Sequence, residues 1–306
     1  MKTSLIPLIA FFFLCFSCDK IDEVIIPTIE ETTAHGFLKI IDFSSSITED
    51  SEIEDFDVED GYIYFIYSKS IYRINLNSES NIAEHLIEDT LDWPATLKVI
   101  GNILYYQGDG SYSLSTDIKQ MDLNNISGGV QSTNSILGSS RSEFCKNADK
   151  LLYVSSPNGL SPINNLYELN QSSSDQLIAT EEYVHLENMR VVDNYLYFSS
   201  VKEIRKLDLN NPTEKSSIVY TIPDIADSFF SDNDILGFDI KDNIIYLTQI
   251  SNNKLLSINL EKPNEDPIIL KTNSNHGVTG YSKMIISNGK LYVKKLSDKQ
   301  LEVFEI

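Results

Sequence analysis

The apolar residues of this chain gather in short stretches rich in Ile, Leu, Val, Tyr and Phe, and turn-forming pairs separate these stretches. Beyond about residue 35, no segment has an amphipathic pattern long enough for a helix. The pattern therefore predicts an all-β fold of short strands joined by hairpins. The turn pairs are Asp60-Gly61, Gly101-Asn102, Asp193-Asn194, Asp242-Asn243 and Asn288-Gly289.

Two short motifs recur six times along the chain. The first is an aliphatic residue directly before a tyrosine, and the tyrosines are Tyr64, Tyr105, Tyr153, Tyr197, Tyr246 and Tyr292. The second, downstream motif is an acid or amide between apolar residues, centred on Asn75, Asp122, Glu168, Asp208, Asn259 and Glu305. The tyrosines are 41 to 49 residues apart, which is the period of a four-stranded propeller blade. We therefore expect a six-bladed β-propeller in which the tyrosines pack between blades.

The last repeat is one strand short, because the chain ends at its second motif. Residues 36–43 have strand character and no place in the first repeat, so we expect them to complete the last blade and close the ring. An open array of six repeats, or a sandwich, is the alternative. The expected propeller covers 35–306, with blades at about 52–90, 95–138, 142–180, 185–222, 235–272, and 281–306 with 36–43.

The amino end has the features of an export signal, with Lys2 followed by a short apolar run from Leu5 to Phe16. Ser17-Cys18 after this run resembles a bacterial lipobox, although Phe16 is bulky for that motif. The resemblance implies a lipoprotein signal peptide over 1–17, an acylated Cys18 that binds the lipid bilayer, and a flexible tether over 18–34. Acidic residues after Cys18 resemble the surface-export signal of Bacteroidetes lipoproteins. We therefore expect a cell-envelope, outer-membrane protein that faces either the periplasm or the exterior.

The net charge limits the expected partners, and the cysteine content limits the expected disulfides. The formal net charge is −21, with no cluster of Lys and Arg, which argues against a nucleic-acid partner. With Cys15 in the signal and Cys18 acylated, Cys145 is left alone in the folded domain, so no internal disulfide is expected. We expect Cys145 to be a small buried apolar residue rather than a nucleophile.

Recognition residues are expected in the connections between the second and third strands and between blades, which emerge on one face of a propeller. Trp93 and Tyr112 offer an apolar platform there, and Arg141, His185 and His276 offer polar contacts; ordinary loop packing is the alternative for each. The candidate ligand-binding residues are Trp93, Tyr112, Arg141, His185, Phe229 and His276.

No sequence motif predicts a catalytic or metal site, and no cofactor is expected. The four histidines include no closely spaced pair, and residues 231–234 lack the frame of a calcium-binding loop. Asp89-Thr90-Leu91 matches the acceptor pattern for O-glycosylation in Bacteroidetes, which would place a glycan on Thr90.

In its repeats and its lipobox, the chain resembles two groups of proteins. These are the six-bladed propellers of the NHL and low-density-lipoprotein-receptor types, and the propeller lipoproteins of Bacteroidetes. The resemblance implies a membrane-anchored, non-enzymatic recognition or scaffold propeller that binds a protein or glycan partner through its loop face. The first alternative is a metal-dependent, lactonase-like hydrolase with its site in the central channel, which requires at least three convergent Asp, Glu or Asn oxygens. A scaffold in outer-membrane protein assembly is the third hypothesis.

Overall fold

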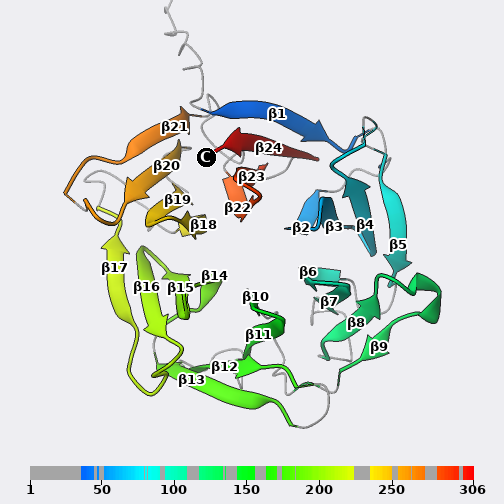
Figure 1. The fold of residues 1–306 in the computed structure, drawn as a ribbon, viewed down its shortest axis with the longest axis horizontal. Helices are drawn as coiled ribbons and strands as arrows, with labels where there is room; N and C mark the ends of the chain where they lie inside the picture. Colours follow the sequence, from blue (N-terminus) through cyan, green and yellow to red (C-terminus); the bar gives the residue numbers. More distant parts are fainter. Residues whose placement is uncertain are drawn as a thin grey trace, which may run out of the picture. The chain divides into compact units, whose positions relative to one another are not determined.

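The computed structural model contains six four-stranded sheets (Figure 1). It describes residues 36–44, 47, 52–78, 80, 82–89, 94–108, 117–133, 135, 143–155, 163–170, 174–182, 184–223, 235–249, 254–262, 264–272, 281–295 and 299–306. Within these residues one short 3-10 helix, η1 (Ile126–Gly128), accompanies the strands. No helix in the described part of the chain is long and apolar enough to span a membrane.

Each of the first five sheets consists of four consecutive strands, which we call blades 1 to 5. Blade 1 comprises β2 (Ile53–Glu59), β3 (Tyr62–Tyr67), β4 (Ser70–Asn75) and β5 (Glu84–Glu88). Blade 2 comprises β6 (Pro94–Ile100), β7 (Ile103–Gly108), β8 (Lys119–Asp122) and β9 (Gln131–Ser132). Blade 3 comprises β10 (Phe144–Asn147), β11 (Lys150–Ser155), β12 (Ile163–Glu168) and β13 (Gln176–Glu182). Blade 4 comprises β14 (Glu187–Val192), β15 (Tyr195–Ser200), β16 (Glu203–Asp208) and β17 (Ser217–Thr221). Blade 5 comprises β18 (Ile235–Lys241), β19 (Ile244–Gln249), β20 (Lys254–Asn259) and β21 (Ile268–Thr272).

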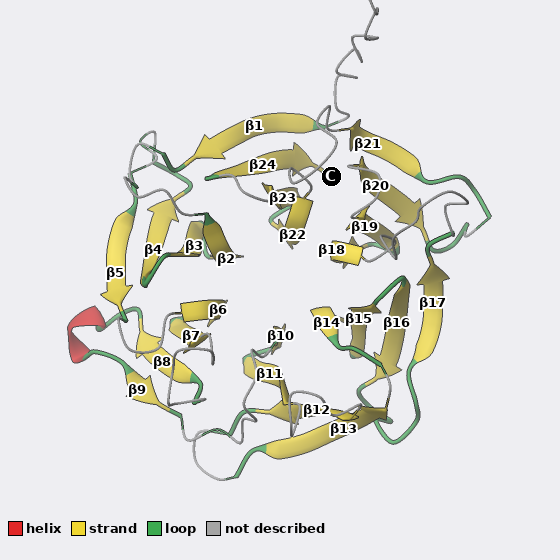
Figure 2. Ribbon diagram, turned by 180° about the vertical axis from the view of Figure 1, so that it is seen from behind, coloured by secondary structure: helices red, strands yellow, loops and turns green. Residues whose placement is uncertain are grey.

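The sheets follow one another around a central axis, with the first strand of each blade innermost (Figures 1 and 2). Neighbouring inner strands contact one another around the ring, and the main hydrophobic clusters lie between adjacent blades. The prediction of a six-bladed β-propeller is confirmed.

Blade 6 combines both ends of the described chain. It contains β22 (Tyr281–Ser287), β23 (Lys290–Lys295) and β24 (Gln300–Glu305), with β1 (Phe37–Asp42) as its outer strand. β1 pairs antiparallel with β24, and Ile41 at its end is 1% exposed. The expected closure of the ring by residues 36–43 is therefore confirmed, and β24 is not left as an open edge.

The second motif of the repeat ends the third strand of a blade. In four blades its Asn or Asp side chain accepts a hydrogen bond from the backbone N–H two residues later, at 2.8 to 2.9 Å. Such Asx turns stop a strand, which explains the preference for a short acid or amide. In five blades the residue directly after this acid or amide donates its backbone N–H to a carbonyl oxygen in the turn between the first and second strands. In blade 1, for example, Leu76 donates to Gly61 O at 2.8 Å. The motif thus ties the two ends of each hairpin unit together.

The repeat tyrosines pack between blades, as predicted, but blade 3 differs from the others. Tyr64 packs in a cluster with residues of blade 2, and Tyr246 packs with residues of blade 6. In blade 3 Leu152 pairs with Cys145 of the inner strand and faces blade 4, whereas Tyr153 clusters with blade 2. Because alternate strand residues face opposite sides of a sheet, the Leu-Tyr pair in blade 3 is one residue out of step with the repeat.

Candidate functional site: the axial cavity

The sequence-predicted ligand-binding residues are only partly within the described chain. Trp93, Tyr112, Arg141, Phe229 and His276 lie outside the described residues, as do Cys18 and Thr90.

His185 is described, and it lies just before β14. Its side chain is 65% exposed, and Nδ1 is 3.9 Å from Oε1 of Glu187. Its backbone N–H donates to Oγ of Ser200 at 3.1 Å. The imidazole is thus accessible at the rim of the inner strands, and its role as a ligand contact remains a prediction.

Five of the six inner strands contain a β-bulge close to their first residues. Bulges lie in β2, β6, β14, β18 and β22. A bulge adds a residue on one strand and redirects its side chain. The residues within four of these bulges line a cavity of about 260 Å³ on the axis; they are Glu54, Asp55, Ala95, Asn188, Met189 and Ser282.

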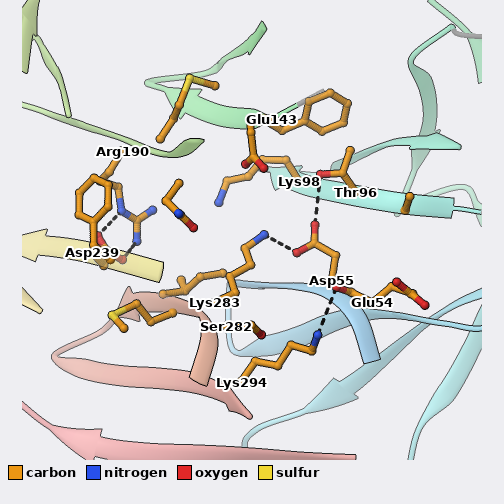
Figure 3. A pocket seen from close by; sticks show the side chains of 17 residues that line it. Glu54, Asp55, Thr96, Lys98, Glu143, Arg190, Asp239, Ser282, Lys283 and Lys294 are labelled. Atoms are coloured by element: carbon orange, nitrogen blue, oxygen red, sulfur yellow. Dashed lines mark hydrogen bonds and ion pairs between the residues drawn. The ribbon is translucent and has the colours of Figure 1, made fainter. Parts of the chain in front are cut away.

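Charged residues of several blades meet in this cavity (Figure 3). Its lining includes four acids and four bases, although the whole chain has 45 acids and only 24 Lys and Arg. The cavity is therefore much less acidic than the chain as a whole. The acids are Glu54, Asp55, Glu143 and Asp239, and the bases are Lys98, Arg190, Lys283 and Lys294.

Two aspartates of blade 1 bind the inner strand of blade 2. Asp55 accepts the backbone N–H of Leu97 at 2.8 Å and also pairs with Lys283 of blade 6. Asp57 accepts the backbone N–H of Val99 at 2.8 Å and pairs with Lys98 at 2.7 Å. Burial alone would raise the pKa of Asp57, but the Lys98 ammonium and the Val99 N–H hold this pKa below its ordinary value.

A second charged connection joins blades 4, 5 and 6. Nε of Arg190 is 2.6 Å from Oδ1 of Asp239, and Nη2 contacts Oδ2, so the pair is bidentate. Asp239 also accepts the backbone N–H of Ile286 at 2.6 Å, and Arg190 donates to Ile286 O at 3.2 Å. Burial would lower the pKa of Arg190, but the Asp239 carboxylate more than offsets this effect and the pKa is raised.

These charged residues share a spacing in the sequence that lies outside the two repeated motifs. Asp57, Lys98, Arg190 and Asp239 each pair across the hairpin with the repeat tyrosine of their own blade. Each therefore lies seven residues before that tyrosine in the sequence. A charged residue seven positions before the repeat tyrosine, recurring in four blades, is the signal that would have identified the channel.

The chemistry of this arrangement is mainly structural. Asp55, Asp57 and Asp239 each have a cationic partner and a backbone N–H from a neighbouring blade. Within the described residues, no group of three or more His, Cys, Asp or Glu is placed to hold a metal ion. These three aspartates thus connect blades, and their oxygens are bonded to cations and backbone N–H groups rather than converging as a divalent cation prefers.

Cys145 lies in the same ring of inner-strand residues, opposite Leu152. Its side chain is buried, and burial raises its pKa to about 11. A protonated, buried thiol is a poor nucleophile, which agrees with the expected packing role of this residue.

Comparisons with known proteins show that this chain is similar in fold to several solved structures. No protein-family model matches the chain, and no curated protein matches it. Among solved structures, a virginiamycin B lyase from Staphylococcus aureus is 11% identical with a TM-score of 0.55, covering 88% of this chain and 99% of that one. A chain of a mitotic checkpoint complex is 12% identical with a TM-score of 0.56, covering 90% and 96%. A chain of a nidogen/laminin complex is 12% identical with a TM-score of 0.54, covering 72% and 80%. At these identities the likeness extends to the propeller fold alone.

Proposed function

We propose that this chain is a membrane-anchored, non-enzymatic recognition propeller that binds a protein or glycan partner through its loop face. The loop face is the face that carries the connections between second and third strands and between blades. The turn face is the opposite one, where the first two strands of each blade are joined.

The observation that carries the proposal is the difference between these two faces. On the turn face the six connections between first and second strands are two residues long, and the five connections between third and fourth strands are seven or eight residues long. On the loop face, ten residues separate β7 from β8, eleven separate β9 from β10, and thirteen separate β17 from β18. Long connections on a rigid scaffold are where binding residues concentrate. Tyr112, Arg141 and Phe229 fall in these three connections.

The lactonase-like alternative receives less support from the channel. Each of Asp55, Asp57 and Asp239 is neutralised by a lysine or arginine and bonded to the backbone of another blade. Exposing these oxygens to a metal would break contacts that hold the ring together.

Binding through the loop face is tested by probing a glycan array and a panel of envelope and host surface proteins with the purified chain. Each hit is remeasured with a variant in which residues 109–118 are replaced by Ser-Lys, the two-residue connection that joins β3 to β4 in the same chain. The matched control changes Asp242-Asn243 on the turn face to Asn-Gly, the pair that forms the turn at 288–289. We expect the loop variant to lose affinity and the control to keep it.

Unchanged affinity in the loop variant, or lactone hydrolysis that depends on an added divalent metal, would contradict the proposal. Anchoring is tested separately with Cys18→Ala. The parent chain should enter the detergent phase and incorporate labelled fatty acid, and the variant should remain in the aqueous phase. A variant that still enters the detergent phase would refute acylation as the anchor.

A further inference from the structure

Exposed apolar side chains gather on two neighbouring outer strands, β21 and β1. Among the described residues, ten large hydrophobic side chains are exposed, and half of them lie on these two strands. None of the other outer strands carries more than one. We call the five residues the rim patch, and their exposures range from 39% to 62%; they are Phe37, Leu38, Ile40, Ile268 and Ile269.

The two strands form one continuous surface, although they belong to blades 5 and 6. The end of β21 lies beside the start of β1 in both views of the ring (Figures 1 and 2). Nζ of Lys271 on β21 is 5.0 Å from the centroid of the Phe37 ring on β1. Lys271 also bonds to Glu302 at 2.8 Å, and Glu302 is the residue opposite Ile40 in the pairing of β24 with β1. Side chains of both strands therefore meet where the two blades adjoin.

The local charge of these strands differs from that of the whole chain, whose formal net charge is −21. Together β1 and β21 carry two lysines, Lys39 and Lys271, and one acid, Asp42. The nearest acids before β21 are Glu265 and Asp266, both exposed. The patch is thus close to neutral with acids at one end, so it suits an apolar or zwitterionic surface better than an anionic one.

The point where the chain enters the propeller indicates what covers the patch. The carbonyl of Gly36 accepts the backbone N–H of Glu305 at 2.7 Å, so the preceding residues join the propeller directly beside Phe37. The 18 residues from Cys18 to position 35 span at most about 65 Å when fully extended. An acyl group on Cys18 would therefore keep the rim patch near the bilayer at an effective concentration in the millimolar range, where weak apolar contacts suffice.

We propose that the rim patch docks on the lipid bilayer, with its side chains among the headgroups, so that the ring stands on edge on the membrane. This inference rests on the membrane anchoring proposed above. Exposed apolar patches mark contacts with proteins or membranes, and apolar side chains at a bilayer surface bury themselves at the boundary of headgroups and acyl chains.

Docking on edge would also orient the loop face. With blades 5 and 6 against the bilayer, blades 2 and 3 on the other side of the ring lie furthest from it (Figure 1). The connections that contain Tyr112 and Arg141 belong to blade 2 and to the junction of blades 2 and 3. The membrane contact would thus leave these connections accessible to a partner.

The test separates docking from acylation. A chain that begins at residue 19 keeps every described residue, and an N-terminal hexahistidine tag attaches it to phosphatidylcholine vesicles that contain a chelating lipid. A nitrobenzoxadiazole probe is attached through Ile40→Cys or Ile268→Cys, one position at a time. Leu177→Cys is the matched control, because Leu177 is 51% exposed on β13, the outer strand of blade 3. Cys145, the other thiol of this chain, is buried.

Quenching of the probe by phosphatidylcholine with a doxyl group on its acyl chain measures contact with the bilayer. We expect the probes at positions 40 and 268 to be quenched at least about twofold more than the probe at 177. Quenching should persist in molar salt, because an apolar contact is not screened. Leu38→Ser with Ile269→Ser should reduce quenching at position 40 about twofold or more. Val201→Ser with Ile218→Ser, two exposed apolar residues of blade 4, should leave it unchanged.

Equal quenching at positions 40 and 177, no quenching at any position, or loss of quenching in molar salt would each overturn the proposal. Self-association of the untethered chain that Ile40→Ser abolishes would assign the patch to a second copy of the chain, and it would overturn the proposal as well. Because the tag supplies the attachment, these outcomes do not depend on whether Cys18 is acylated. Acylation and binding through the loop face are measured separately, so each can fail while docking holds.

Discussion

Closure of the ring depends on Phe43, the residue directly after β1. Its side chain is 0% exposed, and its ring stacks on that of Phe65 in blade 1, with centroids 4.6 Å apart and an interplanar angle of 17°. Its backbone N–H donates to Lys299 O at 3.0 Å. A residue that follows the outer strand of blade 6 is therefore buried among residues of blade 1 as well as blade 6.

Phe43→Ala should reduce the free energy of unfolding by about 3 to 5 kcal/mol, the usual cost of removing a fully buried phenylalanine side chain. Phe37 at the other end of β1 provides the comparison. It is 39% exposed, and its ring meets Phe304 edge-on at a centroid distance of 5.7 Å. Phe37→Ala should cost no more than about 1.5 kcal/mol, the value of a partly exposed aromatic contact.

The assay is urea unfolding of both variants and the parent, followed by far-ultraviolet circular dichroism. With two to three degrees per kcal/mol for a domain of this size, Phe43→Ala should also lower the melting temperature by roughly 6 to 15 °C. Equal destabilisation by the two variants, or a larger effect of Phe37→Ala, would refute the argument that Phe43 closes the ring by packing between blades 6 and 1.

Three further predictions concern the channel. Asp239→Asn should cost about 3 to 5 kcal/mol of folding free energy, because Arg190 stays buried without a counter-charge. A double-mutant cycle with Arg190→Met measures this coupling, and independent, additive effects would contradict it. Burial lowers the pKa of Lys294 in the folded chain, so the unfolded chain binds the proton more tightly and stability rises with pH. Lys294→Met should therefore be more stable than the parent near neutral pH. The difference in stability should disappear above about pH 10.4, the ordinary lysine pKa. Urea unfolding midpoints of the two chains that do not approach each other as the pH rises would argue against this prediction. Cys145, with a pKa raised to about 11, should react with a thiol reagent at neutral pH only when the chain unfolds. In a chain with both N-terminal cysteines changed to serine, rapid labelling without urea would show that the thiol is accessible.

The sequence determined the strands, their grouping into blades and the ring closure, because the signals for these features are local. Turn pairs such as Asp242-Asn243 adopt the positive φ angles that tight hairpins need, at 50° and 61°. The apolar stretches between such pairs have the length of single strands. Once the last repeat was one strand short, residues 36–43 were the segment available to complete it.

The same local signals misplaced the repeat in blade 3. Leu151, Leu152 and Tyr153 are all buried, and a run of apolar residues does not show which of them faces the next blade. Only pairing with β10 decided that Leu152 takes the place that tyrosine holds in the other blades.

The channel was decided by the tertiary structure. Asp57 meets Lys98 from 41 residues away, Arg190 meets Asp239 from 49, and Lys294 reaches Glu54 across 240. In a chain with 45 acids, no spacing identifies which of them are paired. Ring closure brings the inner strands together, and the bulges aim particular side chains at the axis. The sequence thus specified the blades through short-range periodicity and turn chemistry. The cavity arose only when six inner strands, distant along the chain, converged on one axis.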